Sequence, residues 1–253
     1  MKAYLLAAGY ATRMYPLTRD RAKPLLEVAG APILTHVLRG VLGLEGLSEV
    51  VVIANHRFAP HFARWAEAAE SPVPLRILDD GTTSEDDKLG AIGDLAFALD
   101  LVPPGDESWL VAAGDNLLGF DLRLLEERFR EDASRSLLAV REVARDGPSM
   151  YNEVVVDERG NVQSFREKPA DPVSELAAIA LYFFPASIRE ALAAYLAQGG
   201  NPDAPGHFIA WLVEREPVRA TPLPGPWFDI GSLEGLDHAR SRYRTPRDQR
   251  TSA

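Results

Sequence analysis

Short apolar runs that alternate with segments of helical periodicity constrain this sequence most strongly. The run Val50-Val51-Val52-Ile53 contains no polar residue. A strand that is apolar on both faces is typical of the centre of a parallel sheet that helices cover on both sides. Between Pro32 and Leu44 the apolar residues instead recur at helical spacing. This alternation predicts βαβ units, and therefore an α/β fold with a doubly wound, mostly parallel sheet.

The alternation extends to about residue 134 and then changes. Up to that point the predicted strands are 2–8, 49–54, 75–78 and 109–113, and the predicted helices are 32–44, 58–69, 89–102 and 122–129. Later strands are predicted at 137–143, 153–156, 162–165, 179–184 and near Trp227, with helices at 187–197, 208–214 and 233–243. Glu158-Arg159-Gly160-Asn161 predicts a hairpin turn, and the glycines and prolines between 199 and 222 predict loops.

Length and composition restrict the class of protein. A chain of 253 residues with 46% apolar residues fits one large α/β domain, or a domain with a small lobe. The net charge of −10 argues against a nucleic acid or a membrane surface as partner. There is no cysteine for a disulfide or a thiolate, and we expect no membrane-spanning segment. These features predict a cytoplasmic protein.

The first strand runs directly into a cation-rich loop. The apolar run from Ala3 ends at Gly9, and the loop that follows carries two prolines and the cations Arg13, Arg19, Arg21 and Lys23. In α/β proteins such a loop presents backbone N–H groups and cations to phosphate. It matches neither Gly-x4-Gly-Lys-Ser/Thr nor Gly-x-Gly-x-x-Gly. From the residues alone, an arginine-rich surface loop remains the alternative.

The longer motif adds a family resemblance. Leu-Ala-Ala-Gly-x-x-Thr-Arg-Met-x-Pro-Leu-Thr, followed by Lys-Pro-Leu, resembles the signature of the sugar-phosphate nucleotidylyltransferases, such as the glucose-1-phosphate thymidylyl- and uridylyltransferases. The resemblance implies an enzyme of bacterial type that makes a nucleoside-diphosphate sugar and pyrophosphate from a nucleoside triphosphate and a sugar 1-phosphate. It implies a Rossmann-like, GT-A-type core with a small β-rich sugar-binding lobe, in a single domain over 1–243. Residues 1–134 would bind nucleotide and 135–243 sugar phosphate, with 244–253 a disordered tail.

The resemblance also assigns residues. Arg13 and Lys23 would be catalytic, acting on the phosphates, and Glu167, Lys168 and Tyr182 would bind the sugar phosphate. Asp115 of Gly-Asp-Asn and Asp229 of Trp-x-Asp-x-Gly would hold Mg²⁺. The residues implied to bind the nucleotide are Leu6, Ala7, Ala8, Gly9, Thr12, Gly90 and Asn116. From the residues alone, Asp115 also fits an ordinary turn aspartate.

Departures from the family pattern concern the substrate. Relatives commonly have glycine where Ala11, Asn152 and Ala180 stand, and proline where Ala22 stands. The glutamine that reads the pyrimidine edge is missing, and residues 79–87 are acidic. Carboxylates accept hydrogen bonds only and would favour an amine-bearing base such as cytosine, or they belong to a solvated loop. The triphosphate is therefore left open among dTTP, UTP and CTP.

Two further alternatives stay open. The missing glycines and glutamine also fit a catalytically weak regulatory relative that binds nucleotide sugars. A related cytidylyltransferase that acts on a non-sugar phosphate is the other alternative, although the Gly-Asp-Asn and Glu-Lys-Pro segments favour a sugar phosphate. Neither nucleic acid nor membrane is an expected partner, and a homo-oligomer is compatible with the sequence.

Overall fold

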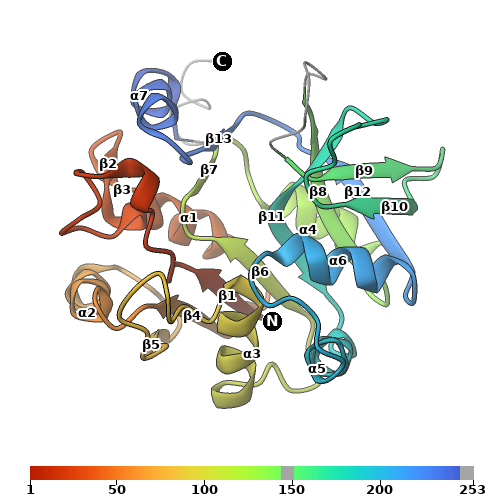
Figure 1. Cartoon of the computed structure of the whole chain (residues 1–253), viewed down its shortest axis with the longest axis horizontal. Helices are drawn as coiled ribbons and strands as arrows, with labels where there is room; N and C mark the ends of the chain where they lie inside the picture. The colour runs from red at the N-terminus through yellow and green to blue at the C-terminus, as the bar shows by residue number, and fades with distance from the viewer. Residues whose placement is uncertain (144–150, 246–253) are drawn as a thin grey trace. The chain divides into compact units, whose positions relative to one another are not determined.

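The structure is a computed structural model, and it describes residues 1–143 and 151–245 (Figure 1). The chain forms two compact units, each built from segments that are far apart in the sequence. We call residues 2–88, 112–124 and 224–245 the opening unit, and residues 1, 89–111, 125–143 and 151–223 the hairpin unit. The predicted halves, residues 1–134 for nucleotide and 135–243 for sugar phosphate, are defined by what they bind. The division into packing units does not test them, and they stay a prediction. The predicted disordered tail lies outside the described residues from position 246 onward.

A parallel sheet forms the centre of the opening unit. Its strands are β1 (Lys2–Leu6), β4 (Glu49–Ala54) and β5 (Leu75–Asp79), with β4 paired to both others. Every residue of β4 is buried, which explains why the interior of this strand contains no polar residue. Because the strands are parallel, the loops that follow them leave from the same edge of the sheet. The predicted α/β class is confirmed.

Helices and short strands complete the opening unit. The helices are α1 (Ile33–Val41), α2 (Ala59–Ala68) and α7 (Leu233–Arg242). The buried residues of α1 recur at helical spacing, as predicted. Two short antiparallel pairs are β2 (Glu27–Val28) with β3 (Ala31–Pro32), and β7 (Asn116–Leu118) with β13 (Trp227–Asp229). The second pair joins segments more than a hundred residues apart in the sequence.

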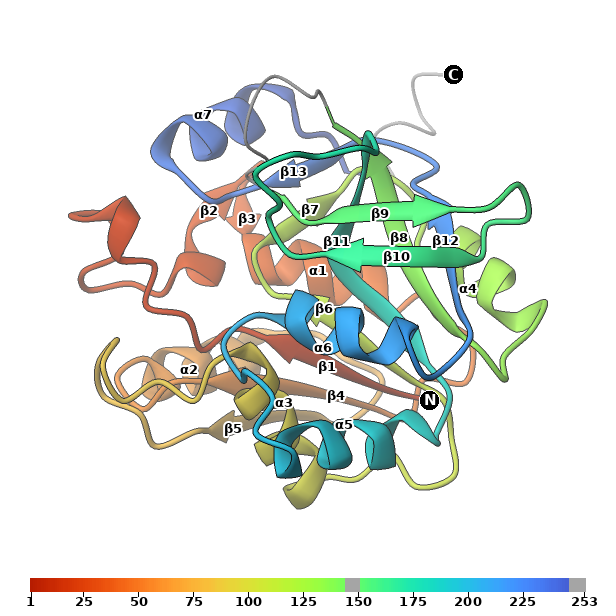
Figure 2. The same cartoon turned by 45° about the vertical axis from the view of Figure 1, so that its right-hand side comes forward.

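The hairpin unit contains most of the antiparallel pairs. The predicted hairpin consists of β9 (Glu153–Val156) and β10 (Val162–Arg166). β11 (Leu176–Phe184) pairs with β9 and with β8 (Ser136–Glu142), and β12 (Val218–Pro222) runs parallel to β8. β6 (Trp109–Ala113) and α4 (Arg123–Arg130) belong partly to this unit. The remaining helices are α3 (Ala91–Leu101), α5 (Ile188–Ala197) and α6 (Pro205–Val213), and α6 packs along β10 (Figure 2).

The structure corrects several predicted elements. α6 begins at Pro205 rather than at residue 208, because proline is pre-organised for the first helical position. Residues 218–222, predicted as loop, form β12, whose hydrogen-bonding partner is β8. The strands β2, β3 and β7 were not predicted, because two or three residues are too few to show a period. Most other predicted boundaries lie within three residues of the observed ones.

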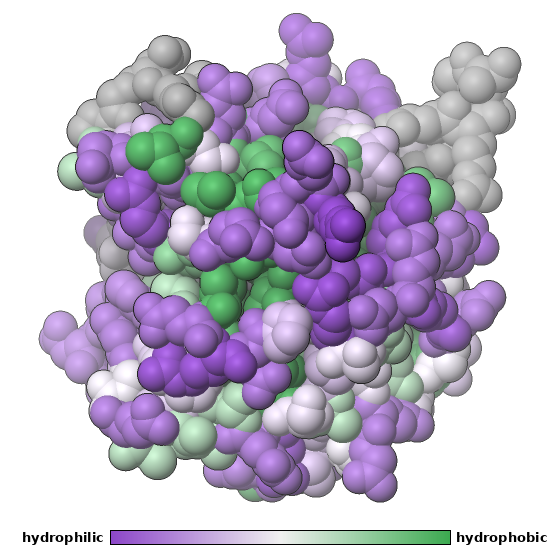
Figure 3. Space-filling view, turned by 90° about the vertical axis from the view of Figure 1, so that its right-hand side faces the viewer, coloured by the Kyte–Doolittle hydropathy of each residue, from purple (hydrophilic) through white to green (hydrophobic). Residues whose placement is uncertain are grey.

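The core and the surface follow the composition. Trp109 is fully buried, and its Nε1 donates a hydrogen bond to the carbonyl oxygen of Pro185 at 3.2 Å. Hydrophilic side chains cover most of the face shown in Figure 3, as expected for a chain with 25% charged residues. Over the described ranges, we find no helix with the length and apolar character needed to cross a membrane.

Candidate active site

The opening loop leaves β1 at Leu6 and is fixed by hydrogen bonds. Ala7 N donates to the carbonyl oxygen of Ile53 in β4 at 2.9 Å. Ala11 has a φ of 49°, in the left-handed region that glycine adopts most readily, at a cost of about 1 kcal/mol for alanine. The hydroxyl of Thr18 donates to the Ala11 carbonyl oxygen at 2.8 Å. Ala11 therefore takes a backbone conformation for which glycine is the favoured residue.

Buried polar side chains that the sequence analysis did not single out support this loop. Asn55 follows β4 directly and is completely buried. Its Nδ2 donates to the carbonyl oxygen of Ala8 at 2.7 Å, and its Oδ1 accepts from Phe58 N at 3.0 Å. The hydroxyl of Tyr10 lies 3.0 Å from Oγ1 of Thr82, which ties the opening loop to the loop after β5. A polar residue at the carboxyl end of a buried strand was the available signal for Asn55.

The structure brings the two predicted catalytic cations and the two predicted metal carboxylates together within the opening unit. Gly114 N donates to the carbonyl oxygen of Leu6 at 2.8 Å, which sets Asp115 beside the end of β1. Nζ of Lys23 forms an ion pair with Oδ2 of Asp115. Asp229 lies at the end of β13, in register with Asn116 of β7. Three separate segments thus supply the four side chains.

The pKa of Asp229 depends on its burial and on the charges of the other three side chains. Burial raises the pKa of the Asp229 carboxyl above its ordinary value, and the negative charge of Asp115 raises it further. The positive charges of Lys23 and Arg13 oppose that shift. Two carboxylates and two cations therefore act on one another at this edge of the sheet. Such an arrangement can hold an anionic ligand through the cations and a hard divalent cation through the carboxylates.

The other residues predicted to bind the nucleotide divide between the two units. Those in the opening unit are Leu6, Ala7, Ala8, Gly9, Thr12 and Asn116. Thr12 begins a short 3₁₀ turn, Thr12–Met14, in which Arg13 is exposed. Gly90 belongs to the hairpin unit and immediately precedes α3.

Gly90 is required by packing. Its φ is 79°, and a Cβ there would lie 2.5 Å from the carbonyl oxygen of Pro202. The first N–H groups of α3 donate to the same segment, Ala91 to Asp203 O and Ile92 to Pro202 O, both at 2.9 Å. The segment at 202–203 thus supplies the acceptors that the start of this helix needs. Contact of Gly90 with a base stays a prediction.

In the acidic loop, residues 79–87, the carboxylates accept hydrogen bonds largely from groups of the loop itself. One oxygen of Asp80 accepts from both the N–H and the hydroxyl of Thr82, each at 2.7 Å. Asp87 accepts from the backbone N–H groups of Thr83 and Ser84, and these bonds lower the pKa of its carboxyl to about 2. Both carboxylates therefore have a structural role in this loop.

The predicted sugar-phosphate residues meet in the hairpin unit. An added Cβ on Gly206 in the first turn of α6 would lie 1.8 Å from Oε2 of Glu167, so this carboxylate lies directly against the helix start. Tyr182 is buried, and burial followed by the charge of Glu167 raises the pKa of its hydroxyl. Lys168 is exposed, and its Nζ lies 3.8 Å from Oε1 of Glu167. Asn152 accepts a hydrogen bond from Ala178 N at 2.7 Å through its Oδ1.

Two further observations delimit the site. A cavity of about 1480 Å³ in the opening unit lies beside α1 and Trp65, but none of the predicted site residues lines it. Within residues 1–143 and 151–245, no three His, Cys, Asp or Glu side chains are grouped so that they could hold a metal ion. A metal at Asp115 and Asp229 would complete its coordination with other oxygen ligands.

A parallel sheet that gathers two cations and two carboxylates where its strands end has the site position and the charges expected of an α/β protein that binds a phosphorylated ligand. The chain belongs to the nucleotidyl transferase family, whose model matches residues 2–245. The predicted resemblance is confirmed at the level of this family.

Individual relatives share most of the chain. Mannose-1-phosphate guanylyltransferase catalytic subunit beta from Drosophila pseudoobscura pseudoobscura is 29% identical over 230 residues, which are 91% of this chain and 59% of the relative. UTP–glucose-1-phosphate uridylyltransferase AglF from Haloferax volcanii is 29% identical over 257 residues, covering 99% of this chain and 100% of that protein. The chain thus spans about three fifths of the fly protein's length and the full length of the archaeal protein.

A solved structure shows the same fold. The crystal structure of UDP-glucose pyrophosphorylase complexed with UDP-glucose superimposes with a TM-score of 0.77. The match covers 95% of this chain and 97% of the other at 20% sequence identity.

Proposed function

We propose that the chain transfers a nucleotidyl group from a nucleoside triphosphate to a sugar 1-phosphate, forming a nucleoside-diphosphate sugar and pyrophosphate. The observation that carries the proposal is the gathering of Arg13, Lys23, Asp115 and Asp229 from three segments of the opening unit. Family membership supports nucleotidyl transfer. The names of the relatives support sugar 1-phosphates as acceptors, since they include guanylyl-, uridylyl- and thymidylyltransferases of such compounds.

The chemistry consists mainly of charge neutralisation. An oxygen of the sugar 1-phosphate attacks the α-phosphorus, the bond from that phosphorus to the bridging oxygen of the β-phosphate breaks, and pyrophosphate leaves. Both reactants are polyanions, so their repulsion opposes the approach. Arg13 offers a planar guanidinium that can bind phosphate oxygens in pairs, and Lys23 offers a point charge. Together these cations would offset the charge at the reacting phosphates.

Asp115 and Asp229 fit a divalent cation such as Mg²⁺. This ion usually binds through one or two carboxylates and completes its shell with phosphate oxygens and water. The raised pKa of the buried Asp229 beside Asp115 is the expected property of a carboxylate pair that a cation would stabilise. Magnesium, when bound, supplies further positive charge to the phosphate oxygens. Lys23 is already paired with Asp115, so its ammonium group and the ion would both contact this carboxylate.

Glu167, Lys168 and Tyr182 supply the proposed sugar-phosphate site. Lys168 is exposed enough for its ammonium group to reach a phosphate, with 62% of its side chain accessible. The Glu167 carboxylate can accept hydrogen bonds from sugar hydroxyls. Burial raises the pKa of the Tyr182 hydroxyl, and the charge of Glu167 raises it further, which is consistent with Tyr182 lying near this carboxylate.

The regulatory alternative rests on the missing glycines and on the missing glutamine, and the local structure at two of the glycine positions bears on it. Ala11 adopts the left-handed conformation itself, and the Asn152 side chain is bonded to the backbone of β11. Both side chains are therefore accommodated in an ordered local structure, which supports an active enzyme over a weakened relative.

The test is pyrophosphate release with Mg²⁺ from dTTP, UTP, CTP and GTP, each with a panel of sugar 1-phosphates. We expect release that depends on both substrates. Asp115→Asn should lower kcat/KM by about a hundredfold or more, because it removes charge at the reacting centre. Asp237→Asn, on the exposed face of α7, is the matched control and should retain wild-type activity. Absence of release from every pair would refute the proposal, and tight nucleotide-sugar binding without turnover would favour the regulatory alternative.

A further inference from the structure

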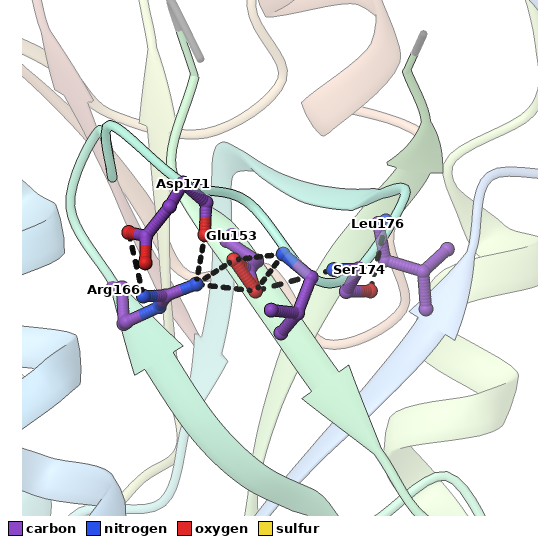
Figure 4. Close-up of polar contacts among 6 residues, drawn as sticks. Glu153, Arg166, Asp171, Ser174 and Leu176 are labelled. Atoms are coloured by element: carbon purple, nitrogen blue, oxygen red, sulfur yellow. Dashed lines mark hydrogen bonds and ion pairs between the residues drawn. The ribbon is translucent and has the colours of Figure 1, made fainter. Parts of the chain in front are cut away.

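The loop between β10 and β11 carries Glu167 and Lys168, and both of its ends converge on one carboxylate. That carboxylate belongs to Glu153 of β9, whose side chain is only 2% exposed. Figure 4 shows its oxygens facing Arg166, at the start of the loop, and the backbone just before β11. We call Glu153 and Arg166 the loop clamp.

The hydrogen bonds of the clamp come from both sides of the loop. Nη2 of Arg166 donates to Oε2 of Glu153 at 2.6 Å, and Arg166 is also the register partner of Glu153 in the β9–β10 pair. Val173 N donates to Oε2 at 3.0 Å, and Ser174 N donates to Oε1 at 3.2 Å. The same Nη2 of Arg166 donates to the carbonyl oxygen of Asp171 at 2.8 Å. The clamp therefore fixes where the loop leaves β10, where it enters β11 and one point between.

Only a carboxylate satisfies this set of donors. Among residues 1–143 and 151–245, every hydrogen-bond partner of the two Glu153 oxygens is an N–H, so both oxygens accept. Hydrogen bonds of this kind between charged groups are about twice as strong as neutral ones. Because the Glu153 carboxylate is buried, loss of a hydrogen-bond partner is costly: the charge left behind is neither solvated by water nor paired.

The loop between the clamped ends holds a conformation that a free chain would avoid. Lys168 has a φ of 44°, in the left-handed region, which is costly for a side chain with a Cβ. The preceding Glu167 lies against Gly206 of α6. Such a backbone persists when its surroundings determine it from several sides, here through the clamp and α6.

We propose that Glu153 is a positioning residue, which acts with Arg166 to hold Glu167 and Lys168 in place for the sugar phosphate. This inference rests on the proposed function. Glu153 touches neither substrate in this proposal. Its loss should therefore weaken the sugar-phosphate side of the reaction and leave the triphosphate side unchanged.

The test separates the two KM values. Glu153→Gln replaces one accepting oxygen with an NH₂ group that faces N–H donors. We expect the KM for sugar 1-phosphate to rise about tenfold and the KM for triphosphate to stay within twofold. Arg166→Gln removes the same ion pair by changing the partly exposed partner. It should likewise raise the KM for sugar 1-phosphate and leave the KM for triphosphate unchanged. This variant keeps the test available if Glu153→Gln does not fold. The double variant should be less impaired than the product of the single effects, since two amides can pair with each other.

Glu49→Gln is the matched control. Glu49 is also a buried carboxylate bonded to cations, Lys2 and Arg76, but it lies at the amino end of β4. Its loss should lower Tm and change neither KM. A second readout is amide hydrogen exchange, which should become at least tenfold faster at Val173 and Ser174 in Glu153→Gln and stay unchanged there in Glu49→Gln.

The outcomes distinguish this inference from the proposed function. If wild-type protein releases no pyrophosphate from any substrate pair, the proposed function fails. If wild-type protein is active and Glu153→Gln raises both KM values equally, or neither, the positioning role is overturned while the function stands. Unchanged exchange at Val173 and Ser174 would likewise overturn the clamp.

Discussion

A single methyl group at position 206 tests the place of Glu167 in the site. Gly206 lies in the first turn of α6, and a Cβ added there would lie 1.8 Å from Oε2 of Glu167 and 3.1 Å from Cε1 of Phe165. Ordinary van der Waals contact is about 3.5 Å, so in Gly206→Ala the carboxylate must withdraw by roughly 1.7 Å.

The fold should tolerate this change, whereas the site should not. The atom in the way is the end of a flexible side chain, and alanine stabilises a helix interior relative to glycine by about 0.5–1 kcal/mol. A displacement of about 1 Å at a site can cost up to a hundredfold in rate or binding. We therefore expect the KM for sugar 1-phosphate to rise by about 10- to 100-fold, with the KM for triphosphate and the free energy of unfolding nearly unchanged.

The assay is steady-state pyrophosphate release with each substrate varied at saturating concentration of the other, together with urea unfolding. Gly40→Ala in α1 is the matched control, because no atom lies within 4 Å of the added Cβ. It should increase stability slightly and leave both KM values unchanged. A sugar-phosphate KM within twofold of wild type in Gly206→Ala would refute the role of Glu167. A loss of more than about 2 kcal/mol of stability would refute the argument that the Glu167 side chain absorbs the change.

Two further predictions concern stability. Folding raises the pKa of Asp229 above the ordinary 3.8, so the unfolding free energy falls as pH rises from 3.8 through the folded pKa. Asp229→Asn should consequently be more stable than wild type at pH 7 in EDTA. Urea titrations should show this difference in unfolding free energy vanish below pH 3.8. A variant that is less stable than wild type at pH 7 would contradict the argument. Gly90→Ala should lower the free energy of unfolding by about 2–3 kcal/mol, because strain at its φ of 79° adds to a 2.5 Å approach to Pro202 O. Gly81→Ala has the same φ and no atom within 4 Å, so it should cost only about 1 kcal/mol in the same urea measurement, and equal losses would exclude the clash.

The strands and helices with a clear period were largely predictable. β4 and β6 have the predicted bounds, because a continuous apolar run has only one way to be buried on both faces. α1 follows its apolar spacing, and the β9–β10 hairpin follows its turn residues. β12 was not predictable in this way, since its strand geometry comes from pairing with β8.

The candidate site was predictable as a set of motifs. Arg13, Lys23, Asp115 and Asp229 were each identified from residues nearby in the sequence. Their proximity depends on the parallel sheet and on the pairing of β7 with β13, which no local pattern encodes. Glu153 was missed for the same reason, because it acquires its role from partners that lie elsewhere in the chain. Asn55 had a local signal in its place at the carboxyl end of a buried strand, but its bond to Ala8 depends on the packing of β4 against β1.

The sequence by itself determined the class of fold, the family motif and the chemical types of the candidate residues. These properties follow from periodicity and from residue chemistry, both of which are local. Only the tertiary structure decided that Glu167 lies against Gly206 and that Lys23 pairs with Asp115. It also decided that Glu153 anchors both ends of the loop that carries Lys168. Burial and hydrogen-bond partners are set by how distant segments pack, and the same carboxylate can be a solvated charge or a structural anchor depending on what surrounds it.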